Sequence, residues 1–107
     1  MNQLPFSSLT VKTYREILLK LEVKYFGTLR DVTNKAQETI EIFDEINLKE
    51  LMKTLSDKYG TRFSDLLRLP YLRIFVNDRL FDEGDYEKKM RGGSTITFLL
   101  ALHGGAL

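Results

Sequence analysis

The clearest structural signal in the chain is an amphipathic helix at residues 47–60, which read NLKELMKTLSDKYG. Asn47 is suited to cap this helix, because its side chain can accept a hydrogen bond from the backbone of Glu50 three residues later. Gly60 stands where a C-terminal glycine cap belongs. Apolar residues recur between the two caps at steps of three and four, which places them on one helical face. They are Leu48, Leu51, Met52, Leu55 and Tyr59.

Alternating apolar and polar residues on both sides of this helix predict the sheet that it covers. The expected strands are residues 21–26, 39–43, 72–76, 80–81 and 95–101. The first and last should pair in parallel at the centre of the sheet, because the helix must return the chain to the same sheet. The sequence therefore predicts an α+β fold with one main helix across one mixed sheet. The expected core residues are Val23, Tyr25, Ile40, Leu51, Leu55, Ile74, Val76, Ile96 and Phe98.

The remaining segments are interpreted as connections. Residues 28–35 should form a polar loop, and residues 63–67 a short helical turn before Pro70. The charged residues 82–89 should be a solvated loop, and Gly92-Gly93 a turn. Three regions follow from this interpretation. They are an N-terminal extension at residues 1–19 with a short helix at 13–19, a folded domain with its tail at residues 20–105, and two further residues, 106–107.

Composition excludes several classes of function. The 107 residues suit a single domain, and 16 Lys and Arg against 15 Asp and Glu give a net charge of +1. Nucleic acid is therefore not expected as the main ligand. The absence of cysteine and the single histidine argue against a metal site, a cysteine nucleophile or a Ser-His-Asp triad. The longest apolar run, residues 98–102, is too short to cross a membrane, so we expect a cytoplasmic protein.

The end of the chain carries the most informative motif. The last strand is followed by Leu102, His103 and then Gly104-Gly105. Two consecutive glycines make a thin, conformationally free tail. Such a tail can enter a narrow active site on another protein and present a carboxyl group there. The alternative is a chain end without a function of its own, since termini are often loose and rich in glycine.

Four segments of the chain, taken together, resemble a known family. In order, they are VKYFGTLRD at residues 23–31, the helix at 48–60 with its closing Tyr-Gly, LRIFVND at 72–78, and GSTITF at 93–98 followed by Gly104-Gly105. With these motifs the chain resembles the ubiquitin-like sulfur carriers of the β-grasp fold. It is most similar to the small subunit of molybdopterin synthase and to the archaeal small modifier proteins.

The resemblance implies a mechanism that needs no catalytic residue outside the tail. An ATP-dependent adenylyltransferase of the ubiquitin-activating type would adenylate the carboxyl group of Gly105, with Gly104 keeping the tail slim. A thiocarboxylate formed there would supply sulfur for molybdopterin synthesis or tRNA thiolation, and an activated Gly105 could also be joined to a lysine of a target protein. The carrier would have no activity alone and bind no cofactor or metal, since ATP belongs to the activating enzyme. Its other implied partner is the large subunit of molybdopterin synthase or another sulfur acceptor.

Two departures from the family pattern matter. The family often has Pro-Pro before the tail, where this chain has Leu100-Ala101. The family also ends at the second glycine, whereas here Ala106-Leu107 follow and the terminal carboxylate belongs to Leu107. Either a processing peptidase removes these two residues, or the protein is a ubiquitin-like interaction module without C-terminal chemistry.

Alternation along the strands also predicts an interaction surface. If Tyr25 and Phe98 point toward the helix, their neighbours on the same strands point away from it. Contiguous exposed apolar surface usually marks an interaction site. The alternative is that Tyr14, Ile17 and Leu18 of the N-terminal extension cover this face. The residues expected to bind the partner are Phe26, Phe75 and Leu99 on the strands and Leu102 and His103 on the tail.

Overall fold

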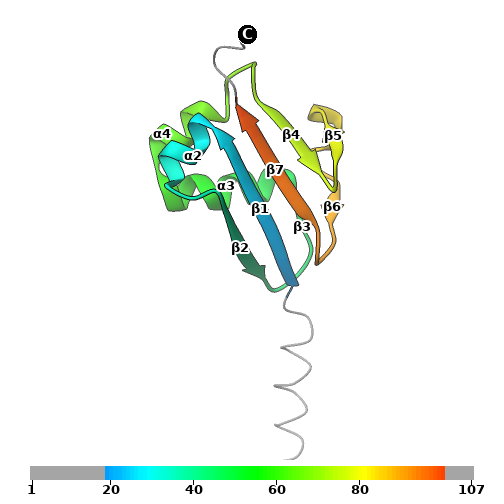
Figure 1. Ribbon diagram of the computed structural model, residues 1–107. Coiled ribbons are helices and arrows are strands. Elements are labelled where there is room, and N and C mark those ends of the chain that lie inside the picture. The colour runs from blue at the N-terminus through cyan, green and yellow to red at the C-terminus, as the bar shows by residue number, and fades with distance from the viewer. Residues whose placement is uncertain (1–18, 101–107) are drawn as a thin grey trace, which may run out of the picture.

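The computed structural model describes residues 19–100, which form a twisted sheet with helix α3 across one face (Figure 1). The five strands run in the spatial order β2-β1-β7-β4-β5, and a separate two-stranded ladder joins β3 to β6. The elements are β1 (Leu19–Gly27), α2 (Thr28–Thr33), β2 (Gln37–Ile42), β3 (Ile46–Asn47), α3 (Leu48–Tyr59), α4 (Thr61–Leu66), β4 (Arg73–Val76), β5 (Arg79–Phe81), the 3₁₀ turn η1 (Glu83–Asp85), β6 (Lys89–Met90) and β7 (Thr95–Leu100).

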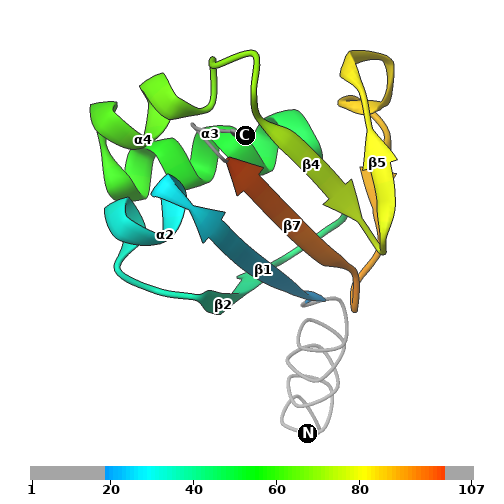
Figure 2. The ribbon, with the colours of Figure 1, turned by 45° about the horizontal axis from the view of Figure 1, so that its top comes forward.

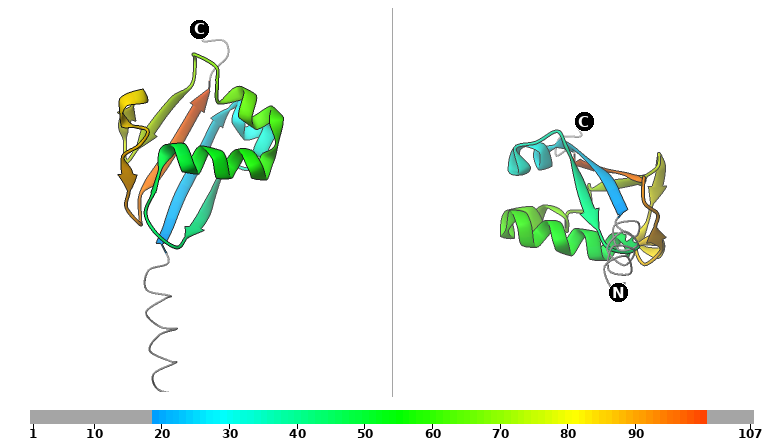
Figure 3. Two further views of the ribbon diagram at one scale, coloured as in Figure 1. Left: turned by 180° about the vertical axis from the view of Figure 1, so that it is seen from behind. Right: turned by 90° about the horizontal axis from the view of Figure 1, so that it is seen from below.

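The first and last strands pair in parallel at the centre of the sheet, as the sequence predicts. The register places Val23 opposite Ile96 and Tyr25 opposite Phe98. Strand β2 pairs with β1, and β4 with β7 and β5, in antiparallel ladders. Seen from behind, α3 crosses the strands, and the view from below separates the helical layer from the sheet (Figure 3). These features confirm the predicted β-grasp fold.

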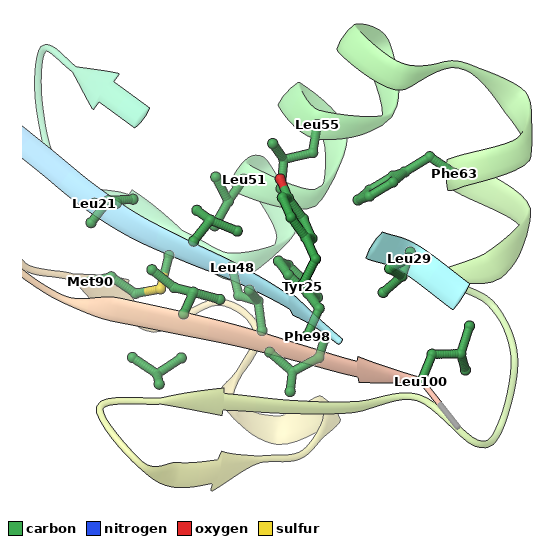
Figure 4. Packing of buried hydrophobic residues seen from close by; sticks show 14 residues of the cluster. Leu21, Tyr25, Leu29, Leu48, Leu51, Leu55, Phe63, Met90, Phe98 and Leu100 are labelled. Atoms are coloured by element: carbon green, nitrogen blue, oxygen red, sulfur yellow. The ribbon is translucent and has the colours of Figure 1, made fainter. Parts of the chain in front are cut away.

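Helix α3 is fixed at its start by the predicted capping box. The Asn47 side chain accepts a hydrogen bond from the backbone N–H of Glu50 at 2.7 Å, and the Glu50 carboxylate accepts one from the N–H of Asn47 at 2.9 Å. The apolar face of α3 then packs on the sheet (Figure 4). All of the predicted core residues are buried except Ile40, which is half-buried because β2 is an edge strand. Buried hydrophobic residues beyond that prediction are Leu21, Leu29, Leu48, Phe63, Met90 and Leu100.

The predicted polar loop at residues 28–35 is wrong in its first part. Residues Thr28–Thr33 form helix α2, in which Leu29 and Thr33 are buried, and the helix ends at Asn34 in the left-handed conformation. The short apolar pattern of Leu29 and Val32 has helical spacing but is too brief to recognise in a polar context. Strand β2 begins at Gln37 and ends before Phe43, and β4 begins at Arg73, one residue later than expected.

The charged segment 82–89 is not wholly a solvated loop. It contains η1, and Asp85 is only 8% exposed, with its carboxylate 2.6 Å from the Lys88 ammonium group. The segment leads directly into β6, which pairs with β3 through Ile46 and Met90. A ladder of two residues a side carries no alternation to detect, which explains why the sequence pattern does not predict it.

Both ends of the chain lie outside the described residues. The predicted N-terminal helix at residues 13–19 falls on this part except for Leu19, which belongs to β1 instead. The folded domain therefore begins at least one residue earlier than the predicted boundary at residue 20. Within residues 19–100, no helix is both long and apolar enough to cross a membrane.

Candidate functional site

The candidate site is the place where the C-terminal tail leaves the sheet. The predicted tail residues Leu102, His103, Gly104 and Gly105 lie outside the described residues, so the structure shows the root of the tail. That root is the end of β7, which lies between β1 and β4 at the centre of the sheet. Figure 2 turns this end of the sheet toward the viewer and shows the end of β7 beside β1 and α2.

Leu100, the last described residue, anchors the root of the tail. Its side chain is completely buried on the helix side of the sheet, as expected from its parity with Ile96 and Phe98. Leu29 of α2 is also completely buried at the same end of the core (Figure 4). The chain is therefore held by core packing up to Leu100.

Gly27 lies opposite Leu100 at the end of β1 and permits an unusually close approach there. A Cβ atom added to Gly27 would lie 1.7 Å from the carbonyl oxygen of Leu100. The residue also has a φ of +76°, which side chains rarely tolerate. Gly27 thus lets β1 turn directly into α2 against the root of the tail. The sequence identifies it only as the end of a strand, although a glycine between a strand and a helix is a recognisable signal.

The face of the sheet turned away from α3 carries the predicted apolar residues near the root of the tail. Phe26 and Leu99 are register partners on β1 and β7 and are 44% and 36% exposed. Phe75 is half-buried on β4 and lies opposite Leu80 of β5, which is 52% exposed. The register therefore places the three predicted residues on one face of the sheet, with Leu99 opposite Phe26 and diagonal to Phe75. It adds Leu80, which strand parity alone could have found. Phe26, Phe75, Leu80 and Leu99 are called the open-face patch below.

A charged cluster supports β1 from the other side of the sheet. The hydroxyl groups of Tyr25 and Tyr59 both donate to Glu38 Oε2 at 2.5 Å. The ammonium groups of Lys58 and Lys35 lie 2.6 Å and 3.2 Å from Glu38 Oε1. These contacts connect β2 and α3 to Tyr25, the residue that precedes the patch on β1. The cluster is called the Glu38 cluster below.

Electrostatics keep Glu38 ionised. Burial alone would raise the pKa of Glu38, but hydrogen bonds from Lys58, Tyr25, Tyr59 and Lys35 outweigh burial and lower this pKa to about 2. Burial and then the hydrogen bond to Glu38 raise the pKa of Tyr25 and of Tyr59, so both hydroxyls stay protonated donors. Every member of the cluster has a partner, which is typical of a structural network.

The described residues present the root of the tail and a partly exposed apolar surface. Between residues 19 and 100, no group of three or more His, Cys, Asp or Glu side chains is placed to hold a metal ion. What the described residues offer is a fixed starting point for the tail, next to an apolar surface on the sheet.

Comparison with protein families gives one match. A model described as the ThiS family matches residues 23–105, which includes Gly104 and Gly105 and ends before Ala106. The matched region covers most of the chain. A comparison with curated protein sequences finds no significant match.

Several solved structures share the fold. Small archaeal modifier protein 1 from Methanosarcina acetivorans is 16% identical, with a TM-score of 0.63, over 82% of this chain and 98% of that one. Urm1 from Trypanosoma brucei is 20% identical, with a TM-score of 0.63, over 82% and 97%. In the complex of subunits 1 and 2 of molybdopterin-converting factor from Helicobacter pylori, the matching chain is 25% identical, with a TM-score of 0.54, over 78% and 95%.

Proposed function

Because the chain belongs to the ThiS family of ubiquitin-like sulfur carriers, we propose that Gly105 is the acyl group that it carries. The observation that supports this proposal best is the family match that continues from the β-grasp domain through the diglycine. The tail that bears Gly105 starts from a fixed point, since Leu100 is completely buried and Gly27 packs against its carbonyl group.

The proposed chemistry begins with the carboxylate of Gly105. This carboxylate attacks the α-phosphate of ATP in the active site of an adenylyltransferase, and pyrophosphate leaves. A hydrosulfide-level sulfur nucleophile then attacks the acyl carbon, AMP leaves, and a thiocarboxylate remains on Gly105. Alternatively, a cysteine thiolate of the enzyme displaces AMP to give a thioester, from which a lysine amine takes the acyl group. Under this proposal the activating enzyme supplies any acid or base that either route needs.

The acceptor that we favour is a molybdopterin precursor held by a large synthase subunit. Its support is the likeness to subunit 1 of the converting factor from Helicobacter pylori, whose structure is a complex with subunit 2. The competing use is transfer to tRNA or to a protein lysine. The likeness to a small archaeal modifier protein supports this use. The open-face patch, which borders the root of the tail, is proposed to dock the activating enzyme.

Ala106-Leu107 must be removed before activation under this proposal, because the reacting carboxylate has to belong to Gly105. The test is ATP–pyrophosphate exchange by the activating enzyme, with the full-length chain and with a chain ending at Gly105. We expect exchange with the trimmed chain only. Equal exchange with both chains would show that the two residues do not block activation. A Gly105→Ala change in the trimmed chain should slow exchange strongly, because it adds bulk and restricts the backbone.

The alternative function is a ubiquitin-like interaction module without C-terminal chemistry. The observation that favours it is again Ala106-Leu107, because Gly105 is joined to Ala106 by a peptide bond and has no free carboxylate in the unprocessed chain. The intact mass of the protein from its native cells separates the two functions. A species that ends at Gly105, above all one with an oxygen replaced by sulfur, supports the carrier. A population that ends only at Leu107 supports the interaction module.

A further inference from the structure

A second feature lies at the opposite end of β7 from the tail. A depression of about 360 Å³ is lined by residues of β5 and β6. Figure 1 shows these two strands on the same side of the molecule. The rim of the depression is formed by Arg79, Lys88, Lys89 and Arg91, and no Asp or Glu lines it. We call this feature the basic depression. Because β7 spans six residues, its two ends are about 17 Å apart.

The folded chain separates charges that are mixed along the sequence. Residues 79–91 carry the four cations of the basic depression and an equal number of acids, Asp82, Glu83, Asp85 and Glu87, so the segment is neutral. In the structure Glu83 and Glu87 line a different hollow next to α3, and Asp82 lines a groove beside the loop before β4. The charge of the basic depression is therefore a product of the fold.

Only one acid among the described residues neutralises part of this charge. The Asp85 carboxylate lies 2.6 Å from the Lys88 ammonium group and 3.8 Å from the Arg79 guanidinium group. Lys89 and Arg91 have no ion-pair partner within residues 19–100. The rim thus has two cations that an incoming anion can pair with.

The floor of the basic depression is apolar. Val76 and Met90 are 6% and 3% exposed, and Phe81 is half-buried with the Arg79 guanidinium group 5.7 Å above its ring. Ser94 also lines the floor, and its hydroxyl oxygen accepts a hydrogen bond from the Asn77 amide at 3.3 Å. The hydroxyl proton of Ser94 is engaged with no other described residue, so it can be donated to a ligand.

This combination favours a peptide over a nucleic acid. An apolar floor can take an apolar side chain, while carboxylates on either side of it pair with the rim. Single-stranded nucleic acid instead needs open aromatic faces for base stacking. The one aromatic ring here, Phe81, already has the Arg79 guanidinium group over its face.

We propose that the basic depression docks an acidic peptide segment of a partner protein, with an apolar side chain between its carboxylates. This surface is separate from the tail root, so a partner bound here leaves the tail free to enter an active site. The proposal does not depend on the chemistry at Gly105. It concerns which proteins recognise the domain, whether or not the tail is activated.

The test is a nuclear magnetic resonance titration of the ¹⁵N-labelled full-length chain with the peptide acetyl-DEFDE-amide at about 150 mM salt. We expect saturable amide shifts centred on Arg79, Met90 and Ser94. The double variant Lys89→Glu, Arg91→Glu should weaken binding about tenfold or more, because it replaces attraction by repulsion. The matched control Lys53→Glu, Arg62→Glu makes the same change in net charge on α3 and α4 and should bind within about twofold of the wild type.

A second variant and two further ligands make each outcome of the titration decisive. If the charge-reversed variant does not fold, Lys89→Gln, Arg91→Gln replaces it and should still weaken binding several-fold. The neutral peptide acetyl-NQFNQ-amide should bind much more weakly than the acidic one. Equal binding of the two peptides, an equal loss in the control variant, or no saturable shift would overturn the proposal. Tighter binding of a single-stranded RNA pentamer would assign the surface to nucleic acid instead.

Discussion

Tyr25 and Phe26 are adjacent aromatic residues on β1 with opposite environments. Tyr25 is completely buried, and its hydroxyl group donates to Glu38. Phe26 is 44% exposed beside Leu99. Phe98 and Leu99 repeat this contrast on β7, because successive strand residues point to opposite faces. One face of the sheet therefore forms the core, and the other leaves apolar side chains partly exposed to solvent.

The largest expected difference between the two faces is in stability. Phe98→Ala should lower the free energy of unfolding by about 3–5 kcal/mol, because it leaves a cavity beside the stacked ring of Tyr25. Leu99→Ala, one residue along, should lower it by about 1 kcal/mol or less, because the side chain is already partly in water. Urea denaturation of both variants measures the difference. Similar losses of unfolding free energy from both substitutions would show that the open face contributes as much to stability as the core face.

The next largest effect on stability is expected at Gly27, where β1 ends against the root of the tail. Gly27→Ala should cost about 3 kcal/mol, because the new Cβ meets the Leu100 carbonyl oxygen at a positive φ. Gly60→Ala is the matched control, since Gly60 also has a positive φ but has open space where the Cβ would lie. Strain alone should cost about 1 kcal/mol there. Equal losses in urea denaturation would mean that contact with the tail root is unimportant for stability.

The third effect concerns the Glu38 cluster behind the sheet. The pKa of Glu38 falls from 4.5 to about 2 on folding, so its contribution to stability is complete above pH 4.5. That contribution is lost as the pH falls from 4.5 through 2, and it amounts to about 2 kcal/mol once solvent screening is allowed for. Denaturation at a series of pH values measures it.

Glu38→Gln is the control for this pH dependence, because the amide cannot titrate. The variant should be less stable than the wild type at pH 6, and the difference in the free energy of unfolding between the two proteins should shrink toward pH 2. A constant difference across this range would contradict the low pKa of Glu38. Glu87→Gln provides a second comparison. The Glu87 carboxylate is exposed and lies 3.9 Å from the ammonium group of the exposed Lys49, and such surface ion pairs contribute little to stability.

Regular patterns made the sheet and main helix predictable from the sequence. The capping residues Asn47 and Gly60 bound the helix, and alternation on β1 and β7 placed Phe26 and Leu99 on the same open face. Short elements escaped prediction: α2 has six residues, and the β3–β6 ladder has two residues a side. Neither is long enough to show a period.

Contacts between distant segments were also beyond prediction. The closeness of Gly27 to Leu100 depends on the register of β1 against β7, and Glu38 meets Lys58 across 20 residues of chain. The basic depression is hidden for the same reason, because the acids at 82–87 separate Arg79 from the other three cations and leave residues 79–91 neutral. The pairing of strands and the packing of helices determine these neighbours, and a single sequence contains no direct record of them.

The smallest effect on stability and the most specific effect on binding are expected at the open-face patch. Phe75→Ser and Leu99→Ser should each weaken binding to the activating enzyme by about tenfold, as is usual for exposed apolar residues at the centre of an interface. Thr39→Ser is the control. Thr39 lies on β2 opposite Glu22, on the same open face of the sheet as the patch but away from it. Isothermal titration calorimetry measures the affinity, and circular dichroism checks that each variant is folded.

This last prediction also separates docking on the sheet from recognition through the tail alone. If folded Phe75→Ser and Leu99→Ser variants bind as tightly as the wild type, the open-face patch has no part in docking, and the tail is sufficient. If the N-terminal extension covers the patch, deleting residues 1–18 should tighten binding of the otherwise unchanged chain. The same deletion should then have no effect in the Leu99→Ser variant, because the extension and the enzyme would compete for one surface. If the deletion changes the affinity equally in the wild type and in the Leu99→Ser variant, the extension does not cover the patch, and the extension and the enzyme do not compete for one surface.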